Sequence, residues 1–210
     1  MVTLLHLDSS AALVGSVSRR LTTRFAGGWA ALGHATVRRD LFVDQPPHLP
    51  SNVLHWAPSL RAAGESVDPA HDRYQEELVG ELLAADVVLL GAPMYNWSVP
   101  STLKAWIDWI HVPGMTAPAS SDDPAPLGGK PIVIASGRGL AYGPDTGNVD
   151  HQLAALNQMF AESMQMIVYP VLAELTLADR VAALAPYAAR ATASLAGAEA
   201  EIDRLLTELG

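Results

Sequence analysis

The stretch Thr3-Leu4-Leu5-His6-Leu7-Asp8-Ser9-Ser10 begins the pattern that decides the fold, because a short apolar run ends in a polar loop that enters a helical segment at residues 18–32. Apolar runs of the same kind recur at residues 87–90, 132–135 and 166–171. Their continuous apolar character is typical of parallel strands that are covered on both faces. A weaker run at residues 36–41 contains Arg38, Arg39 and Asp40 and indicates an edge strand.

Helical patterns lie between these runs and after them, at residues 72–85, 101–111 and 150–165 and in an alanine-rich segment that ends near Leu209. Pro186 divides this last region into a short turn and a long helix. Strands and helices alternate along a single domain at residues 1–210. This order predicts an α/β fold, a doubly wound five-stranded parallel sheet with helices on both faces, whose ligand site lies beyond the carboxyl ends of the strands at a topological switch point.

The composition fits one folded domain, since 50% of the 210 residues are hydrophobic and 17% are charged. The formal net charge of -9 disfavours binding to nucleic acid or to an anionic membrane surface. The absence of cysteine excludes disulfides, thiolate catalysis and cysteine-ligated metal centres. Any redox chemistry must therefore come from a bound cofactor.

The first apolar run is interpreted as a strand, because no basic residues precede it as they would in a signal peptide. The uncharged segment between residues 87 and 104 is interrupted by Pro93, Asn96 and Pro100, which a lipid-facing helix tolerates poorly. We therefore expect a cytoplasmic protein without a membrane span.

Two irregular stretches, residues 42–69 and 113–129, exceed ordinary connection lengths. They are candidates for lids over a binding site or for contacts in a dimer. The alternative is a tolerated surface insertion, because long loops cost little additional closure entropy.

A serine-rich loop at residues 8–18 runs directly into the first helix. Hydroxyls and unpaired backbone N–H groups at a helix N-terminus form a cradle for an anion, and the helix dipole favours a phosphate there. The alternative is that Ser16 or Ser18 serves only as the helix N-cap.

A second polar loop, Gly91-Ala92-Pro93-Met94-Tyr95-Asn96-Trp97-Ser98-Val99-Pro100-Ser101, follows the run at residues 87–90. Its backbone amides, aromatic side chains and asparagine suit a planar heteroaromatic ring with polar edges. Trp97 could instead be a buried anchor without a ligand. Trp106 and Trp109, three residues apart on the next helix, are assigned to the core or to a subunit contact.

Three segments together resemble the family of FMN-dependent NADH-azoreductases and NAD(P)H quinone reductases, which has a flavodoxin-like fold. The segments are Ser10 with Ser16-Val17-Ser18, Pro93-Met94-Tyr95-Asn96-Trp97 leading into Pro100-Ser101-Thr102-Leu103-Lys104, and Ser136-Gly137-Arg138-Gly139. The resemblance extends over essentially the whole chain in order and spacing. It implies that bound FMN passes hydride from NADH or NADPH to a quinone or an azo compound in a ping-pong cycle, within a homodimer.

The resemblance also assigns the cofactor-binding residues. Ser10, Ser16, Val17 and Ser18 match the loop that holds the FMN phosphate, and Met94, Tyr95, Asn96 and Trp97 match the segment that lines the isoalloxazine ring. Ser136, Gly137, Arg138 and Gly139 match the loop at the pyrimidine edge of the flavin. The family usually reads Ser-Arg-Gly-Gly there, so the arginine of this chain lies one position later.

No catalytic triad is expected, because the flavin N5 atom itself carries the hydride. A donor near the N1–C2=O edge of the flavin would come from the backbone of Gly137 or Gly139, or from the guanidinium of Arg138. Alternatively, Arg138 is a surface ion pair or a dimer contact. Tyr142 is either a substrate contact and proton donor or a packed side chain.

Signatures of other chemistries are missing from the sequence, namely a Gly-x-Ser-x-Gly elbow, a phosphate-binding loop ending in Gly-Lys-Ser/Thr, and a His-Glu-x-x-His pair. The seven histidines show no metal-ligand spacing, and His6 is expected to be packed. We therefore expect no metal site.

Other functions stay open at this stage: a flavodoxin-type electron carrier that docks its partners through an acidic surface, a flavin reductase, or a pathway-specific aromatic reductase. The two long loops favour an enzyme, since a one-electron carrier does not need a substrate pocket. For the expected homodimer, the candidate contacts are Trp109, His111 and residues 113–129.

Overall fold

The computed structural model describes residues 2–143 and 145–210, which form one five-stranded sheet in the order β2-β1-β3-β4-β5. All neighbouring strands are parallel. The strands are β1 (Thr3–Asp8), β2 (Ala35–Asp40), β3 (Val87–Gly91), β4 (Pro131–Gly137) and β5 (Ile167–Ala173). This is the flavodoxin-like strand order, so the predicted doubly wound α/β fold is confirmed.

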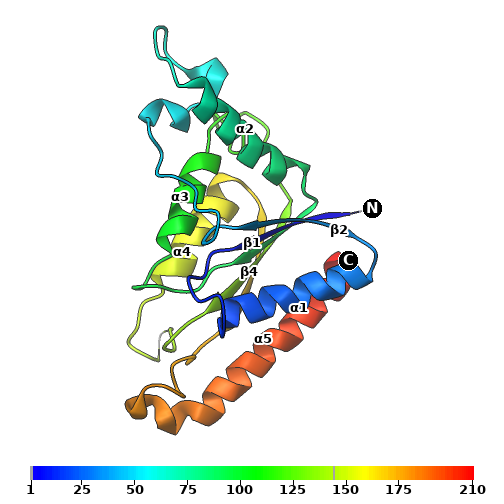
Figure 1. Cartoon of the computed structure of the whole chain (residues 1–210), viewed down its shortest axis with the longest axis vertical. Coiled ribbons are helices and arrows are strands. Elements are labelled where there is room, and N and C mark those ends of the chain that lie inside the picture. The colour runs from blue at the N-terminus through cyan, green and yellow to red at the C-terminus, as the bar shows by residue number, and fades with distance from the viewer. Residues whose placement is uncertain (1, 144) are drawn as a thin grey trace.

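Helices cover both faces of the sheet (Figure 1). On one face, α1 (Val17–Ala31) and α5 (Ala188–Leu209) pack side by side, and Phe25 and Trp29 of α1 share a core cluster with Ile202 of α5. On the other face lie α2 (Pro69–Ala84), α3 (Ser101–Ile110) and α4 (His151–Asn157). Because every strand points the same way, the loops that follow the strands gather at one edge of the sheet.

Local signals place most helix ends. Ser16 is the N-cap of α1 and Asp68 is the N-cap of α2, where the Asp68 carboxylate accepts a hydrogen bond from the Ala70 N–H at 2.8 Å. The expected break at Pro186 is present, because a 3-10 segment at Ala182–Tyr187 precedes α5.

The helix expected at residues 150–165 is not continuous. The α-helical hydrogen bonding of α4 ends at Asn157, and a π-helical segment follows at Gln158–Ser163. Phe160 and Met164 are both fully buried in this region. Apolar spacing alone indicates a helix but does not reveal one widened turn within it.

The run at residues 166–171 was expected to form a strand covered on both faces, yet β5 lies at the edge of the sheet opposite β2. Ile167 is 48% exposed, and Pro170 lies inside the strand. Proline lacks the N–H that a central strand needs, so it is tolerated at an edge. The prediction of an edge strand at residues 36–41 is confirmed by β2.

The two long loops pack against α2 and α3 (Figure 1, top). The first loop contains 3-10 turns at Asn52–His55 and Pro58–Leu60. Leu54 and Ala57 of this loop are buried, and a Cβ on Gly114 of the second loop would lie 3.2 Å from the Ala57 Cβ. Trp109 is fully buried and its Nε1 donates to the Pro47 carbonyl at 2.7 Å, so its assignment to a dimer contact is wrong.

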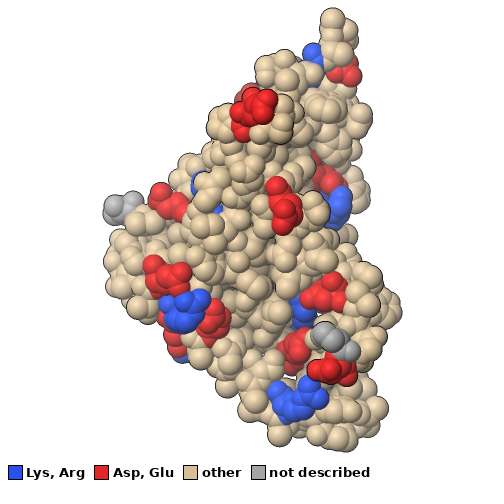
Figure 2. Space-filling view, turned by 180° about the vertical axis from the view of Figure 1, so that it is seen from behind, with Lys and Arg blue, Asp and Glu red and all other residues tan. Residues whose placement is uncertain are grey.

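Among the described residues, no helix combines the length and the apolar character that crossing a bilayer requires. On the face seen in Figure 2, acidic and basic side chains lie scattered in small groups over a mostly uncharged surface. The cytoplasmic location stays a prediction.

Candidate functional site

A cavity of about 350 Å³ opens at the edge of the sheet where the strands end. The loops that follow β1, β3, β4 and β5 all contribute to its walls. β1 and β3 are neighbours in the sheet but lead to helices on opposite faces, so the cavity lies at the topological switch point. Neither of the long loops at residues 42–69 and 113–129 lines this cavity, so the interpretation of these loops as lids over it is wrong.

The serine loop forms one wall of the cavity. Ser10, Ser16, Val17 and Ser18 all line it. The Ser16 hydroxyl accepts a hydrogen bond from the Arg19 N–H at 3.4 Å and lies 3.1 Å from the Ser18 hydroxyl. No acceptor within the described chain engages the backbone N–H groups of Val17 or Ser18, as expected for the first turn of a helix. Ser16 therefore caps the helix, and this cap leaves the N–H groups of Val17 and Ser18 unpaired within the described chain.

A buried charge network beneath the loop fixes its backbone. Arg19 donates through Nη2 to the Ser10 carbonyl at 2.8 Å and through Nη1 to Asp40 at 2.6 Å. Asp8, 1% exposed, lies 3.3 Å from His6 Nε2 and accepts a hydrogen bond from Thr22. Burial by itself would raise the pKa of Asp8, but the neighbouring His6, Thr22 and Arg38 outweigh it and hold the pKa at about 2. The loop thus rests on an ionised carboxylate, and His6 is packed as expected.

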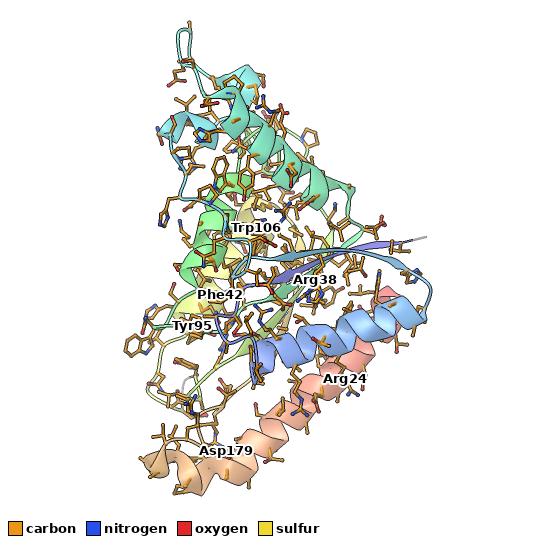
Figure 3. All side chains as sticks on the ribbon, in the orientation of Figure 1. Arg24, Arg38, Phe42, Tyr95, Trp106 and Asp179 are labelled. Carbon is orange, nitrogen blue, oxygen red and sulfur yellow. The ribbon has the colours of Figure 1, made fainter. Side chains whose placement is uncertain are left out.

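The loop after β3 supplies a second wall through Met94 and Tyr95, the latter labelled in Figure 3. The Tyr95 hydroxyl lies 3.2 Å from the Ser10 hydroxyl and accepts a hydrogen bond from the Ala11 N–H at 3.0 Å. This contact joins the second wall to the serine loop.

Asn96 and Trp97 form the two-residue tip of a tight turn and do not line the cavity. Tyr95 and Ser98 exchange two backbone hydrogen bonds of 3.0 Å, and both tip residues have positive φ, 49° and 63°. Such a turn favours asparagine followed by glycine, so a tryptophan in the second position is strained. Trp97 is 60% exposed, which rules out the buried-anchor alternative.

The loop after β4 contributes backbone rather than side chains. Gly137 and Gly139 line the cavity, and a Cβ on Gly137 would lie 3.0 Å from the Val17 Cβ and 3.4 Å from the Ser18 nitrogen. This close approach requires glycine at position 137. Ser136 lies behind the wall, fully buried, and donates to the Gln152 side chain at 2.9 Å.

The Arg138 side chain does not line the cavity. It is 2% exposed, and its Nη1 lies 2.5 Å from the carboxylate of Asp150, the N-cap of α4. Its Nε and Nη2 have no partner within the described chain. Arg138 is therefore a buried ion pair and not a surface one, and only the backbone of this loop faces the cavity.

Tyr142 covers this guanidinium. The Arg138 guanidinium carbon lies 5.7 Å from the centre of the Tyr142 ring, and the Tyr142 N–H donates to Glu174 at 2.9 Å. Burial raises the pKa of the Tyr142 phenol, so it stays protonated at neutral pH. Tyr142 does not line the cavity.

Sequence reasoning missed two groups of residues. Thr176, Leu177 and Arg180, from the loop after β5, line the cavity, as the rule that ligands bind at the carboxyl ends of parallel strands would have indicated. Gln152, fully buried, donates to the carbonyls of Ala92 and Pro93 at 3.1 and 2.9 Å. It links the loops after β3 and β4, and no local pattern marks a glutamine for this role.

Comparisons with known proteins agree with this architecture. A family model described as a flavodoxin-like fold matches residues 2–205. An FMN-dependent NADH:quinone oxidoreductase of Kineococcus radiotolerans is 41% identical, over 98% of this chain and 99% of the relative. A protein of the same name from Methylobacterium radiotolerans is 40% identical, over 91% of this chain and 94% of the relative.

Solved structures show the same fold at lower identity. An azoreductase from Bacillus anthracis str. Sterne superposes with a TM-score of 0.78 at 18% identity and covers 99% of this chain and 100% of its own. An FMN-dependent NADH-azoreductase from Bacillus anthracis str. Ames Ancestor, in complex with FMN, has a TM-score of 0.78 at 19% identity, with 100% and 99% covered.

Proposed function

Because this chain belongs to the flavodoxin-like family that contains the FMN-dependent NADH:quinone oxidoreductases, we propose that it binds FMN in the cavity at the switch point and uses NADH or NADPH to reduce quinones or azo compounds. The observation that carries the proposal is the convergence of an open helix N-terminus, an aromatic wall and a backbone wall on one cavity. The quinone oxidoreductase of Kineococcus radiotolerans aligns over 98% of this chain, which supports extending the proposal to the full domain.

The residues of the cavity fit the cofactor. Its volume of about 350 Å³ lies within the range of small-molecule sites. Ser10, Ser16 and Ser18 offer hydroxyls to a phosphate, and the backbone at Val17 and Ser18 adds unpaired N–H groups. A Cβ at Gly137 would crowd this cradle, which explains why the loop after β4 has glycine there.

When bound, FMN supplies the atom that accepts and donates hydride. The protein contributes position and electrostatics. We propose that the backbone of Gly137 and Gly139, together with Met94 and Tyr95, orients the ring system, while the serine loop holds the phosphate. Arg138 positions the loop after β4 through Asp150 and does not itself contact the flavin.

We further propose a ping-pong order, in which the oxidised nucleotide leaves before the acceptor enters. One observation supports it: the described residues offer one cavity at the carboxyl edge that joins the serine loop to the β3 and β4 loops, so the nucleotide and the acceptor would both have to reach a flavin held in that cavity.

The test begins with the visible absorption spectrum of the purified protein, with and without added FMN. Anaerobic NADH or NADPH should bleach the flavin bands, and a quinone should restore them. Steady-state rates at several quinone concentrations should give parallel double-reciprocal lines. A protein that binds no FMN, or whose flavin no nucleotide reduces, would contradict the proposal.

Ser16→Asp is the matched variant for this test. Aspartate is as good an N-cap as serine, so α1 should keep its start and the protein its thermal stability. Its carboxylate would occupy the cradle and repel a phosphate. We expect Ser16→Asp to lose FMN binding while its far-ultraviolet circular dichroism stays that of the wild type.

The proposal includes a homodimer, as the family resemblance implies. Apolar side chains stand exposed near the cavity, with Leu13 58%, Val14 92% and Trp97 60% exposed. Light scattering during size-exclusion chromatography should give twice the monomer mass, and Val14→Asp should shift it toward the monomer. A wild-type monomer at working concentration would contradict this part of the proposal.

A further inference from the structure

We propose that Arg180 supplies the positive charge that faces the phosphate of FMN. The inference rests on the proposed function and adds a residue outside every motif of the sequence. Arg180 follows β5, at the end of the loop that completes the cavity, and it lines that cavity together with the serine loop.

Among the described arginines around the cavity, Arg180 is the one whose guanidinium is not paired with a carboxylate. The other arginines around the cavity are held by carboxylates: Arg19 by Asp40, Arg20 by Glu199 and Arg138 by Asp150. The guanidinium of Arg180 makes no ion pair and no hydrogen bond within the described residues, and the side chain is exposed. It is therefore free to engage an anion in the cavity.

Hydrogen bonds and apolar packing tie the loop that carries Arg180 to the β4 loop. Thr176 donates to the Arg138 carbonyl through its N–H at 2.9 Å and through its hydroxyl at 3.0 Å. The Arg180 N–H donates to the Leu177 carbonyl at 3.0 Å, and Leu177 packs on Gly139, where a Cβ would lie 2.7 Å from the Leu177 Cδ1. The backbone that holds the guanidinium is thus bonded to the wall formed by the β4 loop.

The electrostatics of the site call for such a cation. A phosphate monoester carries about 1.5 to 2 negative charges at neutral pH. The serine loop offers only neutral donors and the partial charge of one helix end, in a chain whose net charge is -9. A cation at the cavity offsets the repulsion between this acidic chain and the phosphate.

Binding of FMN and of riboflavin, which lacks the phosphate, tests the assignment. Quenching of flavin fluorescence on titration gives the Kd of each ligand for the wild type, Arg180→Ala and Arg180→Lys. We expect Arg180→Ala to weaken FMN by about 10-fold to 100-fold, as loss of a charge-assisted hydrogen bond would, and to leave riboflavin unchanged. Lysine should restore part of the loss, and the difference between wild type and alanine variant should shrink at high salt.

Arg73→Ala is the matched control. Arg73 is exposed on α2, has no ion pair within the described chain, and lies outside the cavity, so the same change in net charge should leave FMN affinity nearly unaltered. If Arg180 contacts the nucleotide instead of the flavin phosphate, Arg180→Ala loaded with FMN should show a raised steady-state KM for NADH.

Each contrary result has a distinct meaning. If the FMN Kd of Arg180→Ala equals that of the wild type, the assignment of Arg180 is overturned. The proposed function still stands in that case, because the wild type binds FMN. Equal weakening of FMN and riboflavin also overturns it, because the side chain would then act on the loop and not on the phosphate. A raised KM for NADH with unchanged FMN affinity places the contact on the nucleotide and overturns the flavin assignment. A wild type that binds neither flavin refutes both the function and the inference.

Discussion

Replacing Asp150 by asparagine should destabilise the protein severely although the two side chains have nearly the same shape. Asp150 accepts a hydrogen bond from the Leu153 N–H at 2.9 Å as the N-cap of α4, and asparagine preserves this cap. What is lost is the negative charge beside Arg138, whose side chain is only 2% exposed. A buried guanidinium without its partner costs about 3–5 kcal/mol.

The lower part of this range is expected, because the Asp150 side chain is 22% exposed and water can approach the site from that side. A loss of about 3 kcal/mol corresponds to a fall in Tm of about 6–12 °C for a chain of this size. Urea unfolding followed by circular dichroism measures the free energy of unfolding directly. Since Arg138 lies between the two glycines that line the cavity, FMN affinity should fall as well.

Two companion variants separate charge from capping. Asp68→Asn changes the exposed N-cap of α2, which has no ion pair within the described chain, and should stay within about 0.5 kcal/mol of the wild type. Arg138→Met combined with Asp150→Asn removes both charges, so the double variant should be more stable than Asp150→Asn alone. If Asp150→Asn unfolds within about 1 kcal/mol of the wild type, the guanidinium is solvated in solution and our reasoning fails.

Three further changes test other parts of the structure. Gly137→Ala places a Cβ 3.0 Å from the Val17 Cβ, so it should lower the free energy of unfolding by about 1–3 kcal/mol and weaken FMN binding. The control Gly197→Ala, in open space on α5, should raise the free energy of unfolding by about 0.5–1 kcal/mol. Equal melting temperatures for the two variants would contradict the close contact at Gly137. Gln152→Ala leaves the buried carbonyls of Ala92 and Pro93 without their donor, so it should lower the free energy of unfolding by about 1–3 kcal/mol. Urea titration measures this change, and a variant as stable as the wild type would contradict the prediction. Burial lowers the pKa of His111, so the unfolded chain binds more protons than the folded chain just below pH 6.5. The free energy of unfolding should therefore fall as the pH drops from 7 toward 5. His111→Asn should flatten this pH dependence, and an unchanged slope in the variant would refute the role of His111.

The fold and the chemistry-bearing loops were predictable because their signals are local. Four of the five strands are short apolar runs, and α1, α2 and α4 begin at a polar N-cap, so much of the order of elements follows from neighbours in the sequence. The serine loop and the loop at residues 91–101 carry their polar groups on consecutive residues. Parallel strands with intervening helices then bring these loops to one edge, and the structure places Ser10, Ser16, Val17, Ser18, Met94, Tyr95, Gly137 and Gly139 in one cavity.

The direction of individual side chains was not predictable in this way. Arg138 was a candidate for the flavin edge, yet it turns inward because Asp150, twelve positions later, caps a helix that starts beside it. Trp97 is held outward by a turn whose geometry depends on the two backbone hydrogen bonds between Tyr95 and Ser98. The directions of these side chains depend on contacts with other residues, and the sequence alone does not show which residues come into contact.

The amino-acid sequence by itself therefore determined the alternation of strands and helices, the absence of thiol chemistry and the two loops suited to a phosphate and a flat ring. Only the tertiary structure decided that the long loops fold against α2 and α3, that the loop after β5 completes the cavity, and that Arg180, among the described arginines around the cavity, has no carboxylate partner. The physical reason is that propensity and capping act over a few residues, whereas burial and charge pairing depend on side chains brought together from distant positions.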